Sequence, residues 1–307
     1  MNHFLTVGTQ VLVLFLLMLV GYFCNKGKIL SKEGNKRISD LVVIVVTPCV
    51  IIKSFQREFN PEMMKLLLVA LLVAVVSHIV MILLAGLCIR NPDEKRNRVL
   101  RFGTVFSNAG FIALPLQEAL LGASGVFFGA AYLVVFNIFL WSWGIYHMSG
   151  DKSTITPKKI LLSPGIIGVA IGMLIFLTSY QLPEVISVTI GHVAALNVPL
   201  PMMVVGYYLA ETNMIEALKD GSCYLCMLLR LILFPLLGMG IMYLIGVPKD
   251  ILVTMVISLS APVGATTTMF SEKFDLDTSR SVQLVSVTTL LSMLTMPLIV
   301  GLAQTIL

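Results

Sequence analysis

The sequence predicts an all-α protein that crosses a membrane many times, and two observations carry this prediction. The 307 residues are 57% hydrophobic and only 12% charged, a balance that water-soluble folds do not tolerate over a whole chain. The charged residues gather in short islands, and the apolar runs between them have about 20 residues, the length a helix needs to cross about 30 Å of hydrocarbon. We therefore expect a polytopic membrane protein surrounded by the lipid bilayer.

Ten apolar runs are present, and each predicts one membrane-spanning helix. The runs lie near residues 5–24, 38–55, 63–89, 99–121, 125–147, 164–181, 185–210, 222–246, 251–271 and 280–305. The first run has no Lys or Arg before it, and a basic loop follows it, so we expect a retained helix rather than a cleavable signal.

The basic residues predict the orientation of these helices. Sixteen of the 21 Lys and Arg residues fall in or beside the odd-numbered loops, which the positive-inside rule places in the cytoplasm. We expect a multi-pass protein of the cell (plasma or inner) membrane with both termini outside the cytoplasm. The net charge of +5 is then a topology signal and does not indicate a nucleic-acid partner.

The longest loop on the cytoplasmic side, residues 148–163, separates five runs from the next five. The expected units are a first five-helix repeat at 1–150, a linker at 151–163 and a second five-helix repeat at 164–307. Because each unit holds an odd number of helices, the second enters the membrane with the opposite orientation, as in inverted-repeat transporters.

The cysteines predict neither a disulfide framework nor a metal site. The chain has five of them, an odd number, scattered through apolar segments. Cys223 and Cys226 have the spacing of zinc ligands, but no second Cys/His pair lies nearby in the sequence. We expect no metal and no cofactor.

Prolines interrupt the second and fourth run of each half. Pro48 lies in the second run and Pro199 and Pro201 in the seventh, while Pro115 lies in the fourth and Pro262 in the ninth. A lone proline would predict a kink in a packed helix. In the fourth and ninth runs, however, the proline comes with Gly, Ser, Asn or Thr at matching places. Paired interruptions of this kind indicate a binding site near the membrane midplane.

Such interruptions predict chemistry suited to an anion. If new half-helices begin at Pro115 and Pro262, the amides of residues 116–118 and 263–265 lack partners in the hydrocarbon. A bound anion would satisfy these donors and the positive end of the helix dipole. Gly110 and Gly264 allow close backbone approach. Asn108 either donates to a carboxylate or locks the two broken helices together.

Three other polar residues within the runs have two possible roles each. His78 is either a proton or ligand site or a neutral imidazole bonded to a neighbouring helix. Asn137 either completes a polar centre or pairs helices. Arg230 either snorkels to the cytoplasmic boundary or attracts an anion entering from inside. The candidate substrate-binding residues are Asn108, Gly110, Pro115, Leu116, Pro262, Val263, Gly264, Thr266, His78, Asn137 and Arg230.

Three stretches resemble the auxin efflux carrier family, the bacterial relatives of the plant PIN carriers. They are VGYFCNKGKILSKEGNKRISDLVVIVVTPCVIIKSF from Val20 to Phe55, SNAGFIALPLQEALLG from Ser107 to Gly122, and SAPVGATTTMFSEKFDLD from Ser260 to Asp277. The resemblance covers essentially the whole chain. It implies ten helices in two inverted halves, with helices 4 and 9 broken and crossing at Pro115 and Pro262, and it matches the family's crossover asparagine to Asn108.

The resemblance further implies a scaffold from helices 1, 2, 6 and 7, a transport part from helices 3–5 and 8–10, an elevator-like cycle, and a homodimer formed through the scaffold. Family substrates are organic acids, and bacterial members are linked to malate or malonate. The chain departs from plant members in two ways. Ser77 and His78 stand where those members have an acid and a lysine, and the loop between helices 5 and 6 is short.

The sequence thus predicts a secondary carrier that moves a small organic acid anion, with efflux favoured. An inside-negative potential gives about 2.3 kcal/mol per charge per 100 mV for anion exit, so no coupling ion is required. A Na⁺- or H⁺-coupled importer is the alternative, followed by a channel or a substrate-sensing membrane protein. An enzyme is not expected, because the sequence has no HExxH or GxSxG motif and no pair of Asp residues within the runs.

Overall fold

The computed structural model describes residues 2–212 and 221–306. Within these residues every secondary-structure element longer than an isolated bridge is a helix. In the first half the helices are α1 (Asn2–Lys26), α2 (Lys32–Leu41), α3 (Thr47–Phe55), α4 (Pro61–Cys88), α5 (Glu94–Val105), α6 (Leu114–Phe139), α7 (Ile145–Ser149) and α8 (Pro157–Leu161). In the second half they are α9 (Pro164–Thr178), α10 (Glu184–Ala194), α11 (Pro199–Glu211), α13 (Ser222–Leu228), α14 (Phe234–Leu244), α15 (Lys249–Ser260), α16 (Thr266–Lys273) and α17 (Thr278–Ile306).

Short polar caps fix several helix starts. Ser31 Oγ accepts a hydrogen bond from the Gly34 amide at 3.0 Å in the first turn of α2. Asn60 and Asp93 cap α4 and α5 in the same way. These side chains satisfy amides that have no partner within the helix. The capped starts lie at the ends of the apolar runs, where the sequence turns polar.

Wide π-helical turns link several of the α-helices into longer rods. They lie at Val42–Val46 between α2 and α3, Ala109–Ala113 before α6, Leu140–Gly144 before α7, and Leu229–Leu233 between α13 and α14. Three of these turns are followed at once by a proline in the first turn of the next α-helix. A π-turn leaves room for the missing amide of that proline, so the rod continues past it.

Seven helical segments in the described part of the chain are long and apolar enough to cross a membrane. They are Leu5–Lys26, Lys32–Phe55, Pro61–Cys88, Ala109–Ser149, Glu184–Glu211, Cys223–Leu244 and Thr278–Ile306. The all-helical membrane class is therefore confirmed, whereas the count of ten and the inverted repeat stay predictions.

Four predicted runs do not each give a separate segment of this kind, and those near 99–121 and 125–147 meet within Ala109–Ser149. Ala109–Ser149 is 41 residues long and changes direction at Gly122, which has a φ of 58°. The run near 164–181 gives an apolar helix of 15 residues, α9. The run near 251–271 is divided between α15 and α16.

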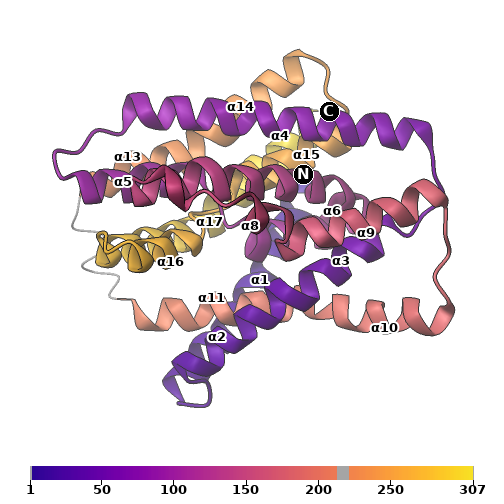
Figure 1. Ribbon diagram of the computed structural model, residues 1–307, viewed down its shortest axis with the longest axis horizontal. Coiled ribbons are helices and arrows are strands. Elements are labelled where there is room, and N and C mark those ends of the chain that lie inside the picture. Colours follow the sequence, from indigo (N-terminus) through magenta and orange to yellow (C-terminus); the bar gives the residue numbers. More distant parts are fainter. Residues whose placement is uncertain (1, 213–220, 307) are drawn as a thin grey trace.

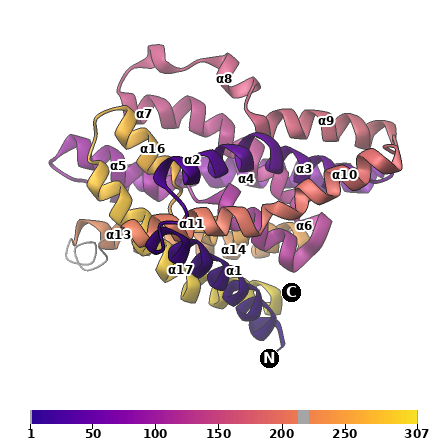
Figure 2. The same cartoon turned by 90° about the horizontal axis from the view of Figure 1, so that it is seen from below.

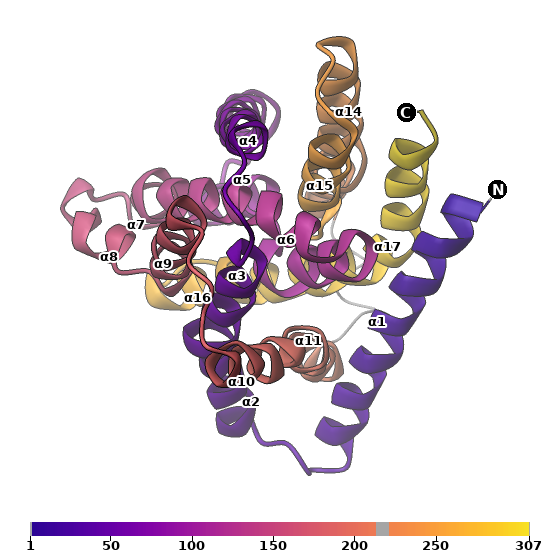
Figure 3. The ribbon, with the colours of Figure 1, turned by 90° about the vertical axis from the view of Figure 1, so that its right-hand side faces the viewer.

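The helices pack in two groups. In the first, α1 packs across α11, and α3 contacts α9 and α10 (Figure 1). In the second, α6 contacts α4 and α15, and α15 also contacts α14 and α17. Figure 3 shows α4 and α14 on the opposite side of the molecule from α10 and α11, with α6 and α15 between them. The core of the protein thus lies around α6 and α15.

The two ends of the described chain lie close together. Helix α1 packs against α17, and Figure 2 shows both helices running toward the same end of the molecule. The orientation of the termini relative to the cytoplasm stays a prediction.

Ion pairs tie α5 to the loop that follows α16. Lys95 Nζ lies 2.9 Å from Asp275 Oδ2, and Arg96 Nε lies 3.1 Å from Asp277 Oδ2. The Lys95 ammonium, as hydrogen-bond donor and nearby charge, lowers the pKa of Asp275. The beginning of one broken helix and the end of the other are therefore joined outside the apolar runs.

Candidate functional site

Both predicted interruptions are present, and they pair with each other. Helix α5 ends at Val105 and helical structure resumes at Ala109, while residues 261–265 separate α15 from α16. Ser107 and Val263 form an isolated antiparallel β-bridge. The Asn108 amide donates to the Pro262 carbonyl at 2.7 Å, and the Gly264 amide donates to the Phe106 carbonyl at 2.9 Å. We call residues 106–108 and 261–265 the paired break.

The first half of the paired break does not end where the sequence predicted. We expected a half-helix to begin at Pro115, but helical structure already begins at Ala109. Asn108 explains the difference, because its Oδ1 accepts a hydrogen bond from the Phe111 amide at 3.3 Å and caps the new helix. The expectation of a start at Pro115 was therefore wrong, and the amides of residues 116–118, Leu116 included, lie inside a helix.

The second half of the paired break contains Pro262, and its helix begins later than expected. Helix α16 starts at Thr266. The Val263 amide donates to Thr288 Oγ1 of α17 at 3.1 Å, and the Gly264 amide is bonded to Phe106. These two donors, which we expected to be free for an anion, are thus satisfied within the protein.

Four other amides are unpaired at the starts of the two half-helices. They belong to Ala109, Gly110, Ala265 and Thr266, for which the described part of the chain supplies no hydrogen-bond acceptor. They immediately follow the two strands of the β-bridge. A helix start offers both free donors and a partial positive charge, so this region favours an anionic group.

Gly264 is required by the close approach of the two chain segments. A Cβ atom on Gly264 would lie 2.8 Å from the Ser107 carbonyl oxygen, well inside contact distance. At Gly110, by contrast, a Cβ would meet nothing within 4 Å. The protein therefore packs tightly on one side of the paired break and leaves space beside the Gly110 amide.

Buried side chains with unused polar atoms gather beside the paired break. His78 is fully buried, with Nδ1 bonded to the Ala74 carbonyl at 2.8 Å and the ring centroid 4.9 Å from that of Tyr132. The Tyr132 hydroxyl faces Ser107 and Arg230. Among the described residues, His78 Nε2 has no hydrogen-bond partner, and the Tyr132 and Ser107 hydroxyls form no hydrogen bond of good geometry, although the Tyr132 hydroxyl interacts with both Ser107 and Arg230. Unpaired polar atoms of this kind are rare in protein interiors and mark a place for a polar ligand or water.

Asn108 presents a further free donor at the same place. Its side chain is only 7% exposed, and its Oδ1 is used in the helix cap. No acceptor for its Nδ2 group is found among the residues that the structure describes. The two roles predicted for Asn108 are therefore compatible. Its side-chain oxygen caps the broken helix, and its side-chain nitrogen is free to donate to a ligand.

Arg230 is fully buried and does not snorkel to a surface. It lies in the π-turn between α13 and α14. Its guanidinium donates to backbone carbonyls at the ends of α5 and α15, among them Val105 at 3.1 Å and Ala261 at 3.0 Å. The expectation of a snorkelling side chain was wrong, and a direct contact with an anion stays an untested prediction.

Asn137 makes no hydrogen bond to the paired break among the described residues. Its Nδ2 donates to the Leu133 carbonyl of its own helix at 2.8 Å. The start of α9 lies nearby, since a Cβ added at Gly165 would lie 3.6 Å from Asn137 Nδ2. The position favours helix pairing, the other role that the sequence allowed.

Gln117 and Thr288 also contribute to the site and were not predicted from the sequence. Gln117 is buried and donates from Nε2 to the Thr254 carbonyl at 3.0 Å and to Ser258 Oγ at 2.8 Å, joining α6 to α15. Thr288 holds the Val263 amide. Gln117 could have been found as the polar residue two positions after Pro115, whereas nothing in the sequence singles out Thr288 among the hydroxyl residues of α17.

Residues 6–300 match the family described as Membrane transport protein. The chain belongs to this family. It is the auxin efflux carrier family that the three sequence stretches indicated, so the resemblance is confirmed. The transporter is also similar to an uncharacterized transporter of Methanothermobacter thermautotrophicus, with 24% identity over 294 residues that cover 94% of this chain and 95% of the relative.

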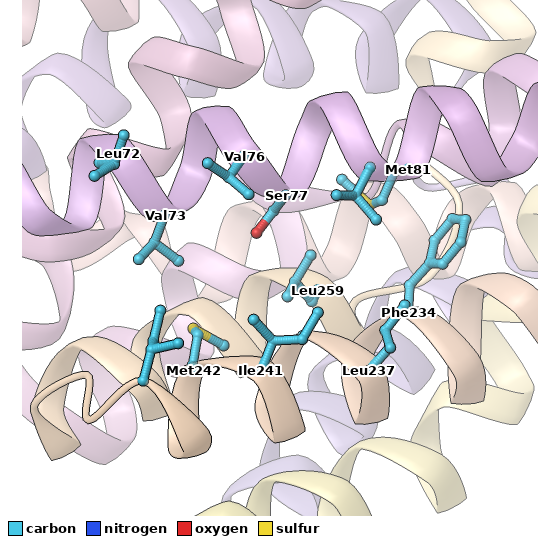
Figure 4. Close-up of a pocket in the computed structure, with 13 residues that line it drawn as sticks. Leu72, Val73, Val76, Ser77, Met81, Phe234, Leu237, Ile241, Met242 and Leu259 are labelled. Carbon is cyan, nitrogen blue, oxygen red and sulfur yellow. The ribbon is translucent and has the colours of Figure 1, made fainter.

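A groove in the transporter lies between α4 and α14 rather than at the paired break. It has a volume of about 140 Å³ and is lined almost entirely by apolar side chains such as Val73, Leu237 and Ile241 (Figure 4). Leu259 of α15 lines it as well. An apolar groove of this kind suits lipid tails better than a charged solute, so the polar paired break is the stronger candidate for a substrate site.

Proposed function

We propose that this transporter is a secondary carrier that binds one carboxylate group of a small organic acid at the paired break and moves it out of the cell. The observation that supports this most is the set of four unpaired amides at Ala109, Gly110, Ala265 and Thr266. Ser107 and Asn108, which precede the first of these amides, add a buried hydroxyl and a free amide nitrogen, and the buried Tyr132 hydroxyl faces Ser107.

The charge of the site matches one carboxylate. Each helix start carries about half a positive charge, so the two starts together offer about one. The chain has no Asp or Glu between residues 106 and 117 or between 260 and 271. An anion bound here therefore meets donors and positive helix ends without a competing acid in either segment.

The proposed architecture is ten spanning helices in two inverted halves, with helices 4 and 9 crossing at the paired break. The contacts of α1 and α3 with α9, α10 and α11 fit a scaffold, and those among α4, α6, α14, α15 and α17 fit a transport part. We propose that the transport part moves against the scaffold in an elevator-like cycle, and that two copies of the chain associate through the scaffold.

Export follows from the charge of the substrate. An inside-negative potential favours anion exit by about 2.3 kcal/mol per charge per 100 mV, which drives efflux without a coupling ion. Cation-coupled import is the competing function, because broken helices can also expose carbonyls that bind Na⁺.

Purified protein in liposomes tests the function. We expect saturable uptake of a radiolabelled dicarboxylate such as malate, stimulation by the same acid on the opposite side, and a thermal shift on binding. Flux that neither saturates nor shows counterflow would indicate a channel. Uptake that needs an inward Na⁺ or H⁺ gradient would indicate the importer.

Removal of the unpaired hydroxyls separates binding from folding. We expect Tyr132→Phe and Ser107→Ala each to weaken substrate binding by about 10- to 100-fold, since a hydrogen bond to a charged group contributes about 1.5–3 kcal/mol. The melting temperature without substrate should change little, because neither hydroxyl forms a hydrogen bond of good geometry within the described protein. Substrate titration by thermal shift measures both effects, with the half-exposed Tyr243→Phe as control. Unchanged affinity in both variants would place the carboxylate elsewhere.

A further inference from the structure

The paired break has a second set of helix ends, formed where α5 and α15 stop. The last carbonyls of a helix have no partner within it and carry about half a negative charge. Here α5 ends at Val105 and α15 at Ser260, on the two strands that approach each other. Two negative ends therefore converge in a buried part of the transporter.

Arg230 bonds both of these ends. Its Nη1 donates to the Val105 carbonyl at 3.1 Å and lies 3.4 Å from the Thr104 carbonyl, both in α5. Its Nη2 donates to the carbonyls of Ser258, at 3.2 Å, and Leu259 in α15. Its Nε donates to the Ala261 carbonyl at 3.0 Å. Every nitrogen of the guanidinium is thus committed to the ends of the two broken helices.

The charges balance. Two helix ends of about minus one half each are matched by a single guanidinium. The planar fork of arginine donates in several directions at once, which a lysine ammonium at one point does not do. Arg230 comes from a third rod, α13 to α14, so its charge reaches the paired break from outside both broken helices.

We propose that Arg230 is a built-in counter-cation that holds the position a coupling Na⁺ would otherwise take at the carbonyl ends of the broken helices. The substrate then crosses without Na⁺. Carbonyls of interrupted helices are the groups that bind coupling cations in other carriers. Here the guanidinium of Arg230 already forms hydrogen bonds to them. The part concerning substrate movement rests on the proposed carboxylate site, whereas the cation position does not.

Arg230 therefore acts as a positioning residue. It holds α5 and α15 end to end, and the free amides of α16 and the Ala109 turn are left for the substrate. The two kinds of helix end in the paired break are therefore treated differently. The carbonyl ends of α5 and α15 are always hydrogen-bonded by Arg230, whereas the free amides are hydrogen-bonded only when an anion is bound.

Chemical rescue tests the cation position without any substrate. In Arg230→Ala we expect the melting temperature to fall by several degrees and to recover in a saturable way with millimolar guanidinium or methylguanidinium. Urea, which has a similar planar shape and no charge, should not restore it. Arg101→Ala is the matched control, because Arg101 also donates to two carbonyls, of Ile89 and Gly86, but lies toward the surface. Its melting temperature should not respond selectively to guanidinium.

Two results would overturn the proposal. The first is Arg230→Ala protein that guanidinium and urea affect equally. The second is wild-type protein whose thermal stability or transport depends on Na⁺ when choline replaces it, a measurement that remains possible even if the alanine variant does not fold. Failure of carboxylate binding by the wild type, with rescue intact, would reject the proposed substrate and leave the cation position standing.

Discussion

Asn108→Asp is expected to abolish transport while the protein still folds. The aspartate oxygen can cap the Phe111 amide as the asparagine oxygen does, so the helix start at Ala109 is retained. The change removes the free Nδ2 donor and places a carboxylate at the positive helix ends that the substrate needs. The lost bond alone corresponds to about 10- to 100-fold weaker binding, and repulsion between like charges adds to it. Counterflow in liposomes measures the result.

Two comparisons isolate the cause. Asn108→Ser keeps a capping oxygen without a negative charge, and a shorter hydroxyl replaces the Nδ2 donor, so we expect this variant to retain part of the transport. Asn137→Asp introduces the same carboxylate at a position with no hydrogen bond to the paired break, and it should keep more transport than the Asn108→Asp variant. Full activity of the Asn108→Asp variant would remove Asn108 from the substrate site.

The interruptions could be predicted from the sequence because each is visible locally. An apolar run that contains Asn108, Gly110 and Pro115 within eight residues cannot be a plain spanning helix. The exact start could not be predicted as well, since two helix-start signals compete there. Proline fits the first turn of a helix, but the capping oxygen of Asn108 acts first, and a π-turn carries the chain past Pro115.

The partners of the buried polar groups could not be predicted, because they come from distant parts of the chain. Arg230 contacts carbonyls of α5 and of α15, and backbone carbonyls carry no sequence signal. Near the end of an apolar run, an arginine is equally compatible with snorkelling. Thr288 and Gln117 were missed for the same reason, since their roles depend on which helix lies opposite.

Gly264→Val is expected to have the largest effect on the fold of the site. The first atom of the new side chain would lie 2.8 Å from the Ser107 carbonyl oxygen and 3.1 Å from Thr266 Oγ1. Relief requires the two strands of the paired break to separate, which breaks the bond from the Gly264 amide to the Phe106 carbonyl. Overpacking of this kind costs about 1–3 kcal/mol, and the lost buried bond adds to it. We expect a lower melting temperature and loss of transport.

Gly110→Val provides the contrast, because a Cβ at Gly110 meets nothing within 4 Å. This variant should fold with nearly wild-type stability, yet transport poorly, since its side chain enters the space beside the free amide. If both variants lose stability equally, the space beside Gly110 is filled by the protein in its working state. If the Gly264→Val variant is as stable as the wild type, the bridge between Ser107 and Val263 is not what holds the broken helices together. The carboxylate site would then lack its fixed geometry, because its free amides are positioned by that bridge.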